Sequence, residues 1–102
     1  MPQLYRSDVF SKWLHGLDDR KGLARILARL RSAELGNFGD SKSLGSGLYE
    51  MRIHTGPGYR IYYTQVGQIT YLLLAGGDKA SQAKDIKAAL QLMNQIQAGM
   101  YP

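Results

Sequence analysis

The sequence contains no cysteine, which excludes disulfide bonds and thiolate metal sites. Its two histidines, His15 and His54, are far apart in the sequence, so a histidine metal cluster is not expected, although carboxylates could still bind a weak cation. The longest fully apolar run, LLLA at 72–75, is far too short to span a bilayer, and the start MPQLYRSD lacks the pattern of a signal peptide. We therefore expect a cytosolic protein that needs no cofactor.

The chain has 102 residues, of which 44% are hydrophobic and 21% charged, as expected for one compact domain spanning residues 1–102. Thirteen Lys and Arg residues against eight Asp and Glu give a formal charge of +5. Such a surface attracts polyanions. Nucleic acid, an acidic protein partner and plain solubility all fit this charge.

The first half of the sequence predicts a short strand and two helices. Residues 2–6 form the strand, and Ser7 or Asp8 can cap a helix whose apolar residues recur at helical spacing. That stripe comprises Val9, Phe10, Trp13, Leu14 and Leu17, with Phe10 and Trp13 expected in the core. Asp18–Asp19 open a second helix, which places Leu23, Ile26, Leu27 and Leu30 toward the core and stops at Gly36.

A basic stripe marks another face of this second helix. Lys21, Arg25 and Arg29 recur every four residues. They could contact ribosomal RNA or an acidic partner segment, but a solvated helix face is the simpler interpretation.

The second half predicts a meander of three strands and a final helix. Side chains alternate over residues 48–55, the turn occupies residues 56–58, and further strands cover 59–66 and 68–75. Gly76–Gly77 are expected to bend the backbone after the third strand. Ser81 caps a helix whose apolar stripe is Ile86, Ala89, Leu90, Met93 and Ile96. The order β-α-α-β-β-β-α indicates the α+β class, an antiparallel meander flanked by two N-terminal helices and one C-terminal helix.

The hairpin carries polar residues on one face. A turn at residues 56–58 places Thr55 opposite Tyr59, His54 opposite Arg60 and Arg52 opposite Tyr62. The residues expected to share this face are Glu50, Arg52, His54, Arg60, Tyr62 and Thr64. A solvated sheet face is one interpretation, because antiparallel sheets often have a wet side.

The other interpretation is a surface that binds and cleaves a phosphodiester. Two arginines can hold a phosphate by bidentate hydrogen bonds and stabilise the charge added in the transition state. His54 can move a proton near neutral pH, and Tyr62 can stack on a base. Lys79 could lie at the rim of the same face. RNA needs no metal for this chemistry, because its own 2′-hydroxyl can be the nucleophile.

Three segments together resemble one known family. The patterns are G-x-Y-E-x-R and G-P-G-Y-R-x-Y-Y within residues 47–63, then L-L-x-G-G-D-K-x-x-Q-x-x-D-I within residues 73–86. Over residues 10–93 the chain resembles the RelE/ParE superfamily of bacterial toxins, in particular the HigB-like addiction module killer proteins related to phage Gp49-like proteins. The resemblance implies the same flanked meander and a toxin encoded beside an antitoxin.

The resemblance also implies activities and partners. Many relatives cut messenger RNA in the ribosomal A site as mRNA interferases, whereas the ParE branch inhibits DNA gyrase. The antitoxin often carries a helix-turn-helix domain, through which the complex binds operator DNA. A toxin remnant that only binds its antitoxin is a third hypothesis.

The resemblance assigns site residues individually. Arg60 matches the catalytic arginine of RelE-like nucleases, Lys79 a functional basic residue after the third strand, and Arg52 a basic residue on the preceding strand. Glu50 stands where RelE has a basic residue, and the C-terminal tyrosine of RelE has no counterpart, so His54 or Asp85 is the candidate substitute. We assign catalysis to Arg60, Lys79, Arg52 and His54, and substrate contact to Tyr62, Lys84, Arg25 and Arg29.

Overall fold

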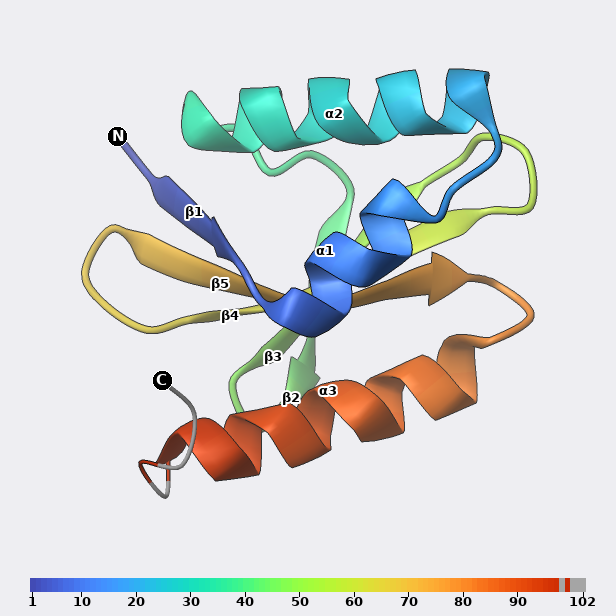
Figure 1. Ribbon diagram of the computed structural model, residues 1–102. Coiled ribbons are helices and arrows are strands. Elements are labelled where there is room, and N and C mark those ends of the chain that lie inside the picture. Colours follow the sequence, from blue (N-terminus) through green and yellow to red (C-terminus); the bar gives the residue numbers. More distant parts are fainter. Residues whose placement is uncertain (98, 100–102) are drawn as a thin grey trace.

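The computed structural model describes residues 1–97 and 99, which form a five-stranded sheet and three helices (Figure 1). The elements are β1 (Gln3–Arg6), α1 (Asp8–His15), α2 (Arg20–Glu34), β2 (Ser41–Gly45), β3 (Leu48–Ile53), β4 (Tyr59–Gln65), β5 (Thr70–Asp78) and α3 (Gln82–Gln97). The strand order is β1-β5-β4-β3-β2, in which β1 runs parallel to β5 and the other neighbours are antiparallel. The predicted α+β class is confirmed. Within the described residues, no helix combines the length and apolarity needed to cross a membrane.

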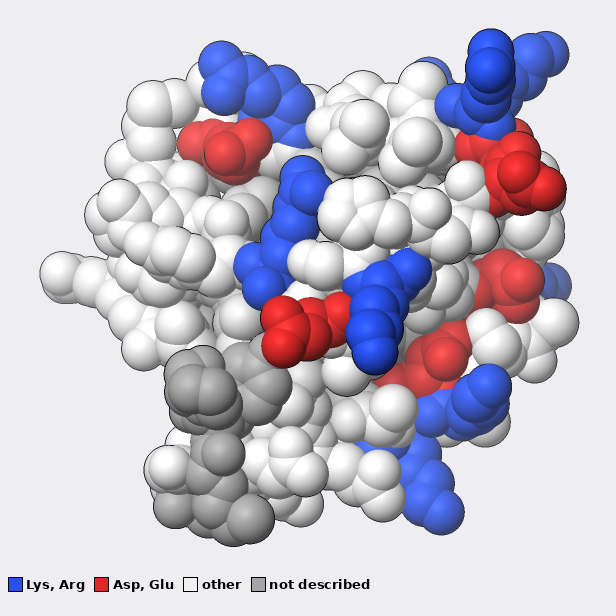
Figure 2. All heavy atoms as spheres, in the orientation of Figure 1, with Lys and Arg blue, Asp and Glu red and all other residues white. Residues whose placement is uncertain are grey.

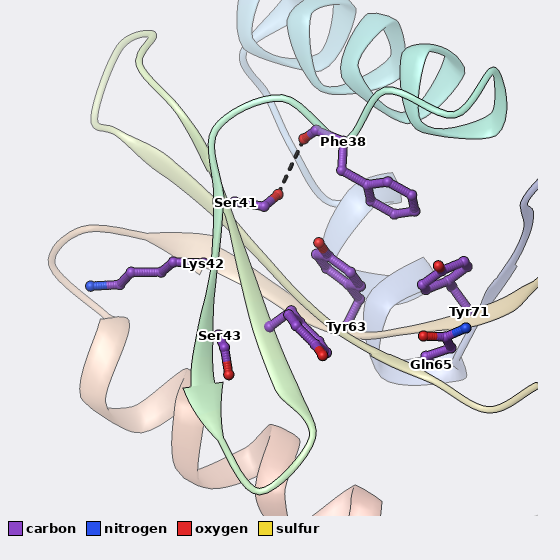
Figure 3. Close-up of a pocket in the computed structure, with 8 residues that line it drawn as sticks. Phe38, Ser41, Lys42, Ser43, Tyr63, Gln65 and Tyr71 are labelled. Atoms are coloured by element: carbon purple, nitrogen blue, oxygen red, sulfur yellow. Dashed lines mark hydrogen bonds between the residues drawn. The ribbon is translucent and has the colours of Figure 1, made fainter.

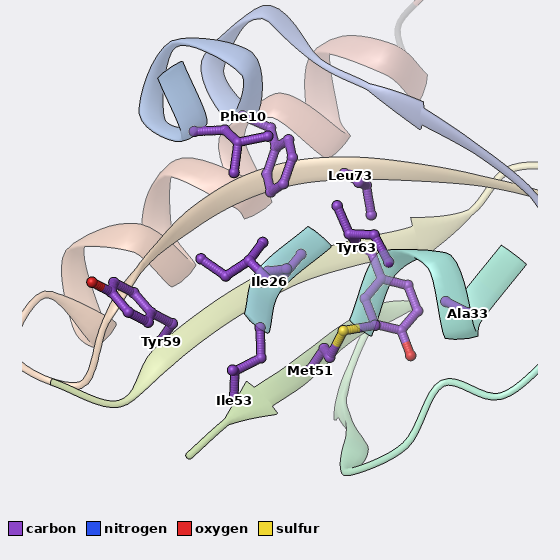
Figure 4. Packing of buried hydrophobic residues seen from close by; sticks show 11 residues of the cluster. Phe10, Ile26, Ala33, Met51, Ile53, Tyr59, Tyr63 and Leu73 are labelled. Carbon is purple, nitrogen blue, oxygen red and sulfur yellow. The ribbon is translucent and has the colours of Figure 1, made fainter. Parts of the chain in front are cut away.

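The sheet separates two hydrophobic clusters. Helices α1 and α2 lie on one face and α3 lies on the other (Figure 1). The larger cluster packs Phe10 and Leu14 of α1 and Ile26 of α2 against Met51 and Ile61 of the sheet (Figure 4). A smaller cluster joins the opposite face of the sheet to α3 and includes Leu48, Tyr62, Leu74, Ala89, Leu92 and Met93. The side chains of β3 and β4 alternate between these two clusters, as the sequence predicts.

Polar side chains fix the starts of the first two helices. Ser7 Oγ accepts a hydrogen bond from Phe10 N at 3.0 Å and donates to Leu74 O at 2.8 Å, which ties α1 to β5. Asp19 caps α2 by accepting from Gly22 N at 3.0 Å. Both predicted N-termini are confirmed. Gly36, just after α2, adopts φ +99°, the left-handed conformation that glycine supplies most readily at a helix end.

Two predictions about strands are wrong. The sequence predicts no strand at β2, because its residues SKSLG include no β-branched or aromatic side chain. The strand forms because its backbone pairs with β3. The third predicted strand does not end before Gly76, since β5 continues to Asp78.

The glycines Gly76 and Gly77 allow close packing within β5. A Cβ on Gly76 would collide with the Trp13 ring of α1, and one on Gly77 would collide with the Asp85 carboxylate of α3. Bare backbone at these two positions lets helices approach opposite faces of the strand.

Three residues of the predicted apolar stripes lie outside the buried core. They are Val9, Leu27 and Leu90, with 49%, 41% and 37% of their surface exposed. In α3 Leu92 is buried instead of Leu90. The face of the helix that packs against the sheet is therefore slightly rotated from the apolar stripe predicted from the sequence.

Candidate functional site

The hairpin of β3 and β4 has a register two residues away from the predicted one. Arg52 lies opposite Arg60, Ile53 opposite Tyr59 and Glu50 opposite Tyr62. The connection is longer than the predicted three-residue turn, with Gly58 N donating to Thr55 O at 3.1 Å. A shift of two residues preserves which face each side chain occupies. The predicted set on β3 and β4 therefore still shares one face, apart from His54, which lies beyond the end of β3.

This face is buried beneath α3. The exposed fractions are 1% for Glu50, 9% for Arg60, 0% for Tyr62 and 8% for Thr64. The interpretation as a solvated sheet face is wrong, because the third helix covers the side that sequence alternation marked as polar. Tyr62 has no exposed ring surface with which to stack on a base.

A cross-strand row brings Asp40, Arg52 and Arg60 together. Asp40 directly precedes β2, and its carbonyl accepts from Arg52 N at 2.8 Å. Its carboxylate accepts from Arg52 Nη2 at 3.1 Å and from His54 Nε2 at 2.6 Å. The hydrogen bond from His54 is the main cause that lowers the pKa of Asp40; burial opposes it, and the contacts with Arg52 lower the pKa further. Two predicted catalytic residues, Arg52 and His54, are thus joined through an aspartate that sequence reasoning missed.

Glu50 is a buried acid on β3, two residues before Arg52 and opposite Tyr62. Its Oε2 accepts from Gln82 Nε2 at 2.8 Å, and its Oε1 lies 3.9 Å from Arg52 Nε. The hydrogen bond ties the first turn of α3 to β3. No spacing in the sequence identified Gln82, because a glutamine at a helix start carries no distinctive pattern.

Arg60 differs from Arg52 in lacking an acidic partner. Its Nη1 donates to Tyr59 O at 3.4 Å, and within residues 1–97 and 99 it makes no ion pair with a carboxylate. Gly58 lies beside this guanidinium. A Cβ on Gly58 would lie 3.8 Å from Arg60 Nη1 and 3.6 Å from Lys79 Cβ, so Arg60 and the exposed Lys79 flank the same glycine.

Four buried polar atoms on this face make no hydrogen bond to the described part of the chain. They are Glu50 Oε1, Arg52 Nε, Arg60 Nε and Tyr62 Oη. Burial is the main cause that raises the pKa of Tyr62, and the negative charges of Glu50 and Asp85 raise it further. The phenol therefore stays protonated and able to donate. Three donors and one acceptor without partners are unusual for so small a region.

The remaining predicted substrate residues lie apart from this face. Arg25 and Lys84 are exposed, on α2 and α3 respectively. Arg29 is already engaged, because its Nη1 donates to Arg52 O at 2.7 Å and its Nη2 to Phe38 O at 3.1 Å. It holds the segment before β2 against β3. On the visible face in Figure 2, Lys and Arg side chains are interspersed with acidic ones instead of forming one patch.

The described residues include no group of three or more His, Asp or Glu side chains placed to hold a metal ion.

The chain is similar to a protein of Haemophilus influenzae. No protein-family model and no solved structure matches the chain. It is 40% identical over 94 residues to an uncharacterized protein of Haemophilus influenzae, an alignment that covers 92% of this chain and 95% of that protein. The chain therefore belongs to the same protein family as this Haemophilus influenzae protein.

Proposed function

We propose that the chain is the toxin of a type II toxin–antitoxin pair and a ribosome-dependent mRNA endoribonuclease. The observation that carries the proposal is Arg60, which is buried directly opposite Arg52 and has no carboxylate partner among the described residues. Like charges directly opposite in a sheet are destabilising, and a buried cation without a counter-ion is costly. Such an arrangement is expected where a bound anion completes the site, and a guanidinium suits phosphate.

The arrangement supports cleavage by the RNA itself. The 2′-hydroxyl gives up its proton and its oxygen attacks the adjacent phosphorus; the bond to the 5′-oxygen breaks, that oxygen takes up a proton to leave as a hydroxyl, and a 2′,3′-cyclic phosphate forms. Arg60 and Lys79, which flank Gly58, stabilise the negative charge that develops on the phosphate oxygens. Because the His54 Nε2–H donates to Asp40, the neutral ring can accept a proton at Nδ1.

The fold gives this proposal further support. A sheet with α1 and α2 on one face and α3 on the other fits the flanked meander of RelE/ParE toxins. As a member of that superfamily the protein would act in the cytoplasm. It would bind a neighbour-encoded antitoxin, often of the helix-turn-helix type, and reach operator DNA through that complex. The net charge of +5 suits both an acidic partner segment and RNA.

The test is to induce the protein in cells and map RNA 5′ ends with and without translating ribosomes. We expect new ends within translated messages, and we expect Arg60→Ala to abolish both these ends and growth arrest. Arg31→Ala is the matched control, because Arg31 is an exposed arginine on α2 and is not part of the cross-strand row. An Arg60→Ala protein that stays toxic and still cleaves would refute the assigned role.

Other outcomes identify the alternatives. Intact transcripts with broken chromosomes and an SOS response would indicate a gyrase inhibitor. No growth effect, together with tight binding to the neighbour-encoded protein, would indicate a binding module without catalysis.

A further inference from the structure

A second candidate site lies on the opposite face of the sheet from Arg60. Beyond the C-terminal end of α2, a pocket of about 320 Å³ opens over β2, β3, β4 and β5 (Figure 3). Its wall includes Phe38, Ser43, Tyr49, Tyr63, Gln65 and Tyr71. Arg52 and Arg60 do not line this pocket, whereas Phe38, Tyr49 and Tyr71 line it and also pack against the larger hydrophobic cluster.

Aromatic rings stack along one wall of the pocket. The Tyr63 ring stacks on Phe38 at 5.3 Å and 22° and on Tyr49 at 5.5 Å and 20°. Tyr71 meets Phe38 at a tilt, 4.8 Å away. Tyr63 is buried, whereas Phe38, Tyr49 and Tyr71 are partly exposed. The buried ring thus fixes the orientation of partly exposed rings that line a cavity.

The stack ends where the edge strand carries only a small side chain. Tyr63 lies opposite Tyr49, and Tyr49 lies opposite Ser43 of β2. Neighbouring positions in a sheet are about 4.5–5.5 Å apart, close to the spacing of the stacked rings. Ser43 is too small to continue the series, so the pocket leaves room for one more flat ring beside Tyr49.

A hydroxyl at this position can contact the edge of such a ring. Ser43 Oγ accepts from Gly45 N at 3.2 Å, which leaves its hydroxyl hydrogen to donate. Gln65 lies at the other end of the stack, beside Tyr71, where its Nε2 donates to Gln68 O at 3.0 Å (Figure 3). Lys42 extends away from the rings on the same strand, where it can meet a phosphate (Figure 3).

We propose that this pocket binds an unpaired RNA base, which stacks on Tyr49 and is held at its edge by Ser43. The inference rests on the proposed function and adds a base-binding subsite to it. Aromatic side chains on a sheet face stack on unpaired bases in many RNA-binding proteins. A nucleobase fits better than an apolar side chain because its edge can accept from the Ser43 hydroxyl and the phosphate attached to it can meet Lys42.

The test uses a single-stranded 2′-O-methyl RNA that contains 2-aminopurine, a base whose fluorescence falls on stacking. This probe lacks the attacking hydroxyl, so the full-length protein binds it without cutting it. We expect quenching with the parental protein and with Tyr49→Phe. Tyr49→Leu should weaken binding about tenfold, equivalent to about 1.4 kcal/mol. Ser43→Phe should fill the pocket and abolish the quenching.

The matched control is Tyr5→Leu, since Tyr5 is a 56% exposed tyrosine on β1 outside the pocket. It should bind like the parental protein. Unchanged affinity and quenching in both Tyr49→Leu and Ser43→Phe would overturn the proposal. So would loss of binding to the neighbour-encoded protein in Ser43→Phe with RNA binding unchanged, because the pocket would then hold a protein side chain.

Failure of the nuclease proposal would be distinguishable. Quenching that depends on Tyr49, in a protein that leaves cellular transcripts intact, would support the base site and refute the nuclease. Isolated small ribosomal subunits separate the two sources of the base. Binding that depends on Tyr49 without mRNA assigns the base to ribosomal RNA, whereas a requirement for mRNA assigns it to the transcript.

Discussion

Replacing Arg60 with methionine should stabilise the protein while abolishing its activity. Methionine keeps the length and apolar stem of the side chain but removes the charge. The lost protein contact is one long hydrogen bond, 3.4 Å to Tyr59 O. The change also relieves a like-charge contact with Arg52, worth roughly 0.2–1 kcal/mol, and a buried Nε–H without a partner, worth roughly 1–3 kcal/mol. Two losses oppose these gains: the hydrogen bond to Tyr59 O and the long-range attraction between Arg60 and the neighbouring carboxylates. We therefore expect the free energy of unfolding to rise by about 1 kcal/mol.

Arg52→Met is the matched control, because Arg52 faces Arg60 but pairs with Asp40 at 3.1 Å and Glu50 at 3.9 Å. Its loss leaves the buried Glu50 without a cation and should cost about 1–2 kcal/mol, a value reduced because Arg52 is partly exposed. Thermal unfolding followed by circular dichroism measures both variants. A gain of about 1 kcal/mol raises Tm by about 4–8 °C in a domain of this size. If Arg60→Met instead lowers the free energy of unfolding by more than about 1 kcal/mol, the guanidinium stabilises the folded protein. The reasoning about an anion site would then be wrong.

Three further predictions concern other parts of the chain. The hydrogen bond to Asp19, with burial, raises the pKa of Tyr59 to about 12. This contribution to stability is therefore complete below about pH 10 and lost as the pH rises through 12. Asp19→Asn should move the Tyr59 transition toward 10 in a spectrophotometric titration read against Tyr59→Phe. The pKa of Asp40 is lowered, so its contribution is present above roughly pH 3.9 and lost as the pH falls through the lower folded value. Asp40→Asn should make the free energy of unfolding depend less on pH at the acid end. An unchanged pH dependence would contradict the ion pairs of Asp40 with Arg52 and His54. Gly76→Ala should destabilise by about 1–3 kcal/mol in urea unfolding, because the new methyl collides with the Trp13 ring, and wild-type stability would refute that contact.

Local patterns in the sequence predicted which elements form and which side chains share a face. Ser7 and Asp19 cap helices because their side chains are short and the side-chain oxygens reach backbone N–H groups three residues further on. This interaction is purely local. The alternation over β3 and β4 likewise placed Arg52 and Arg60 on one face, because the period of two belongs to the backbone itself. The strand β2 escaped prediction because pairing with β3, not its own residues, makes it extended.

The tertiary structure alone decided what that shared face meets. Alternation fixes the side of the sheet but not the hairpin register, which depends on how the turn closes, so Arg60 faces Arg52 instead of His54. Nothing in the spacing of residues shows that α3 packs over Glu50 and Tyr62, or that Asp40 joins Arg52 to His54. These contacts link residues 12 to 32 positions apart. They arise only when the whole chain has buried both faces of one sheet, because burial of apolar surface, and not local geometry, chooses where each helix lies.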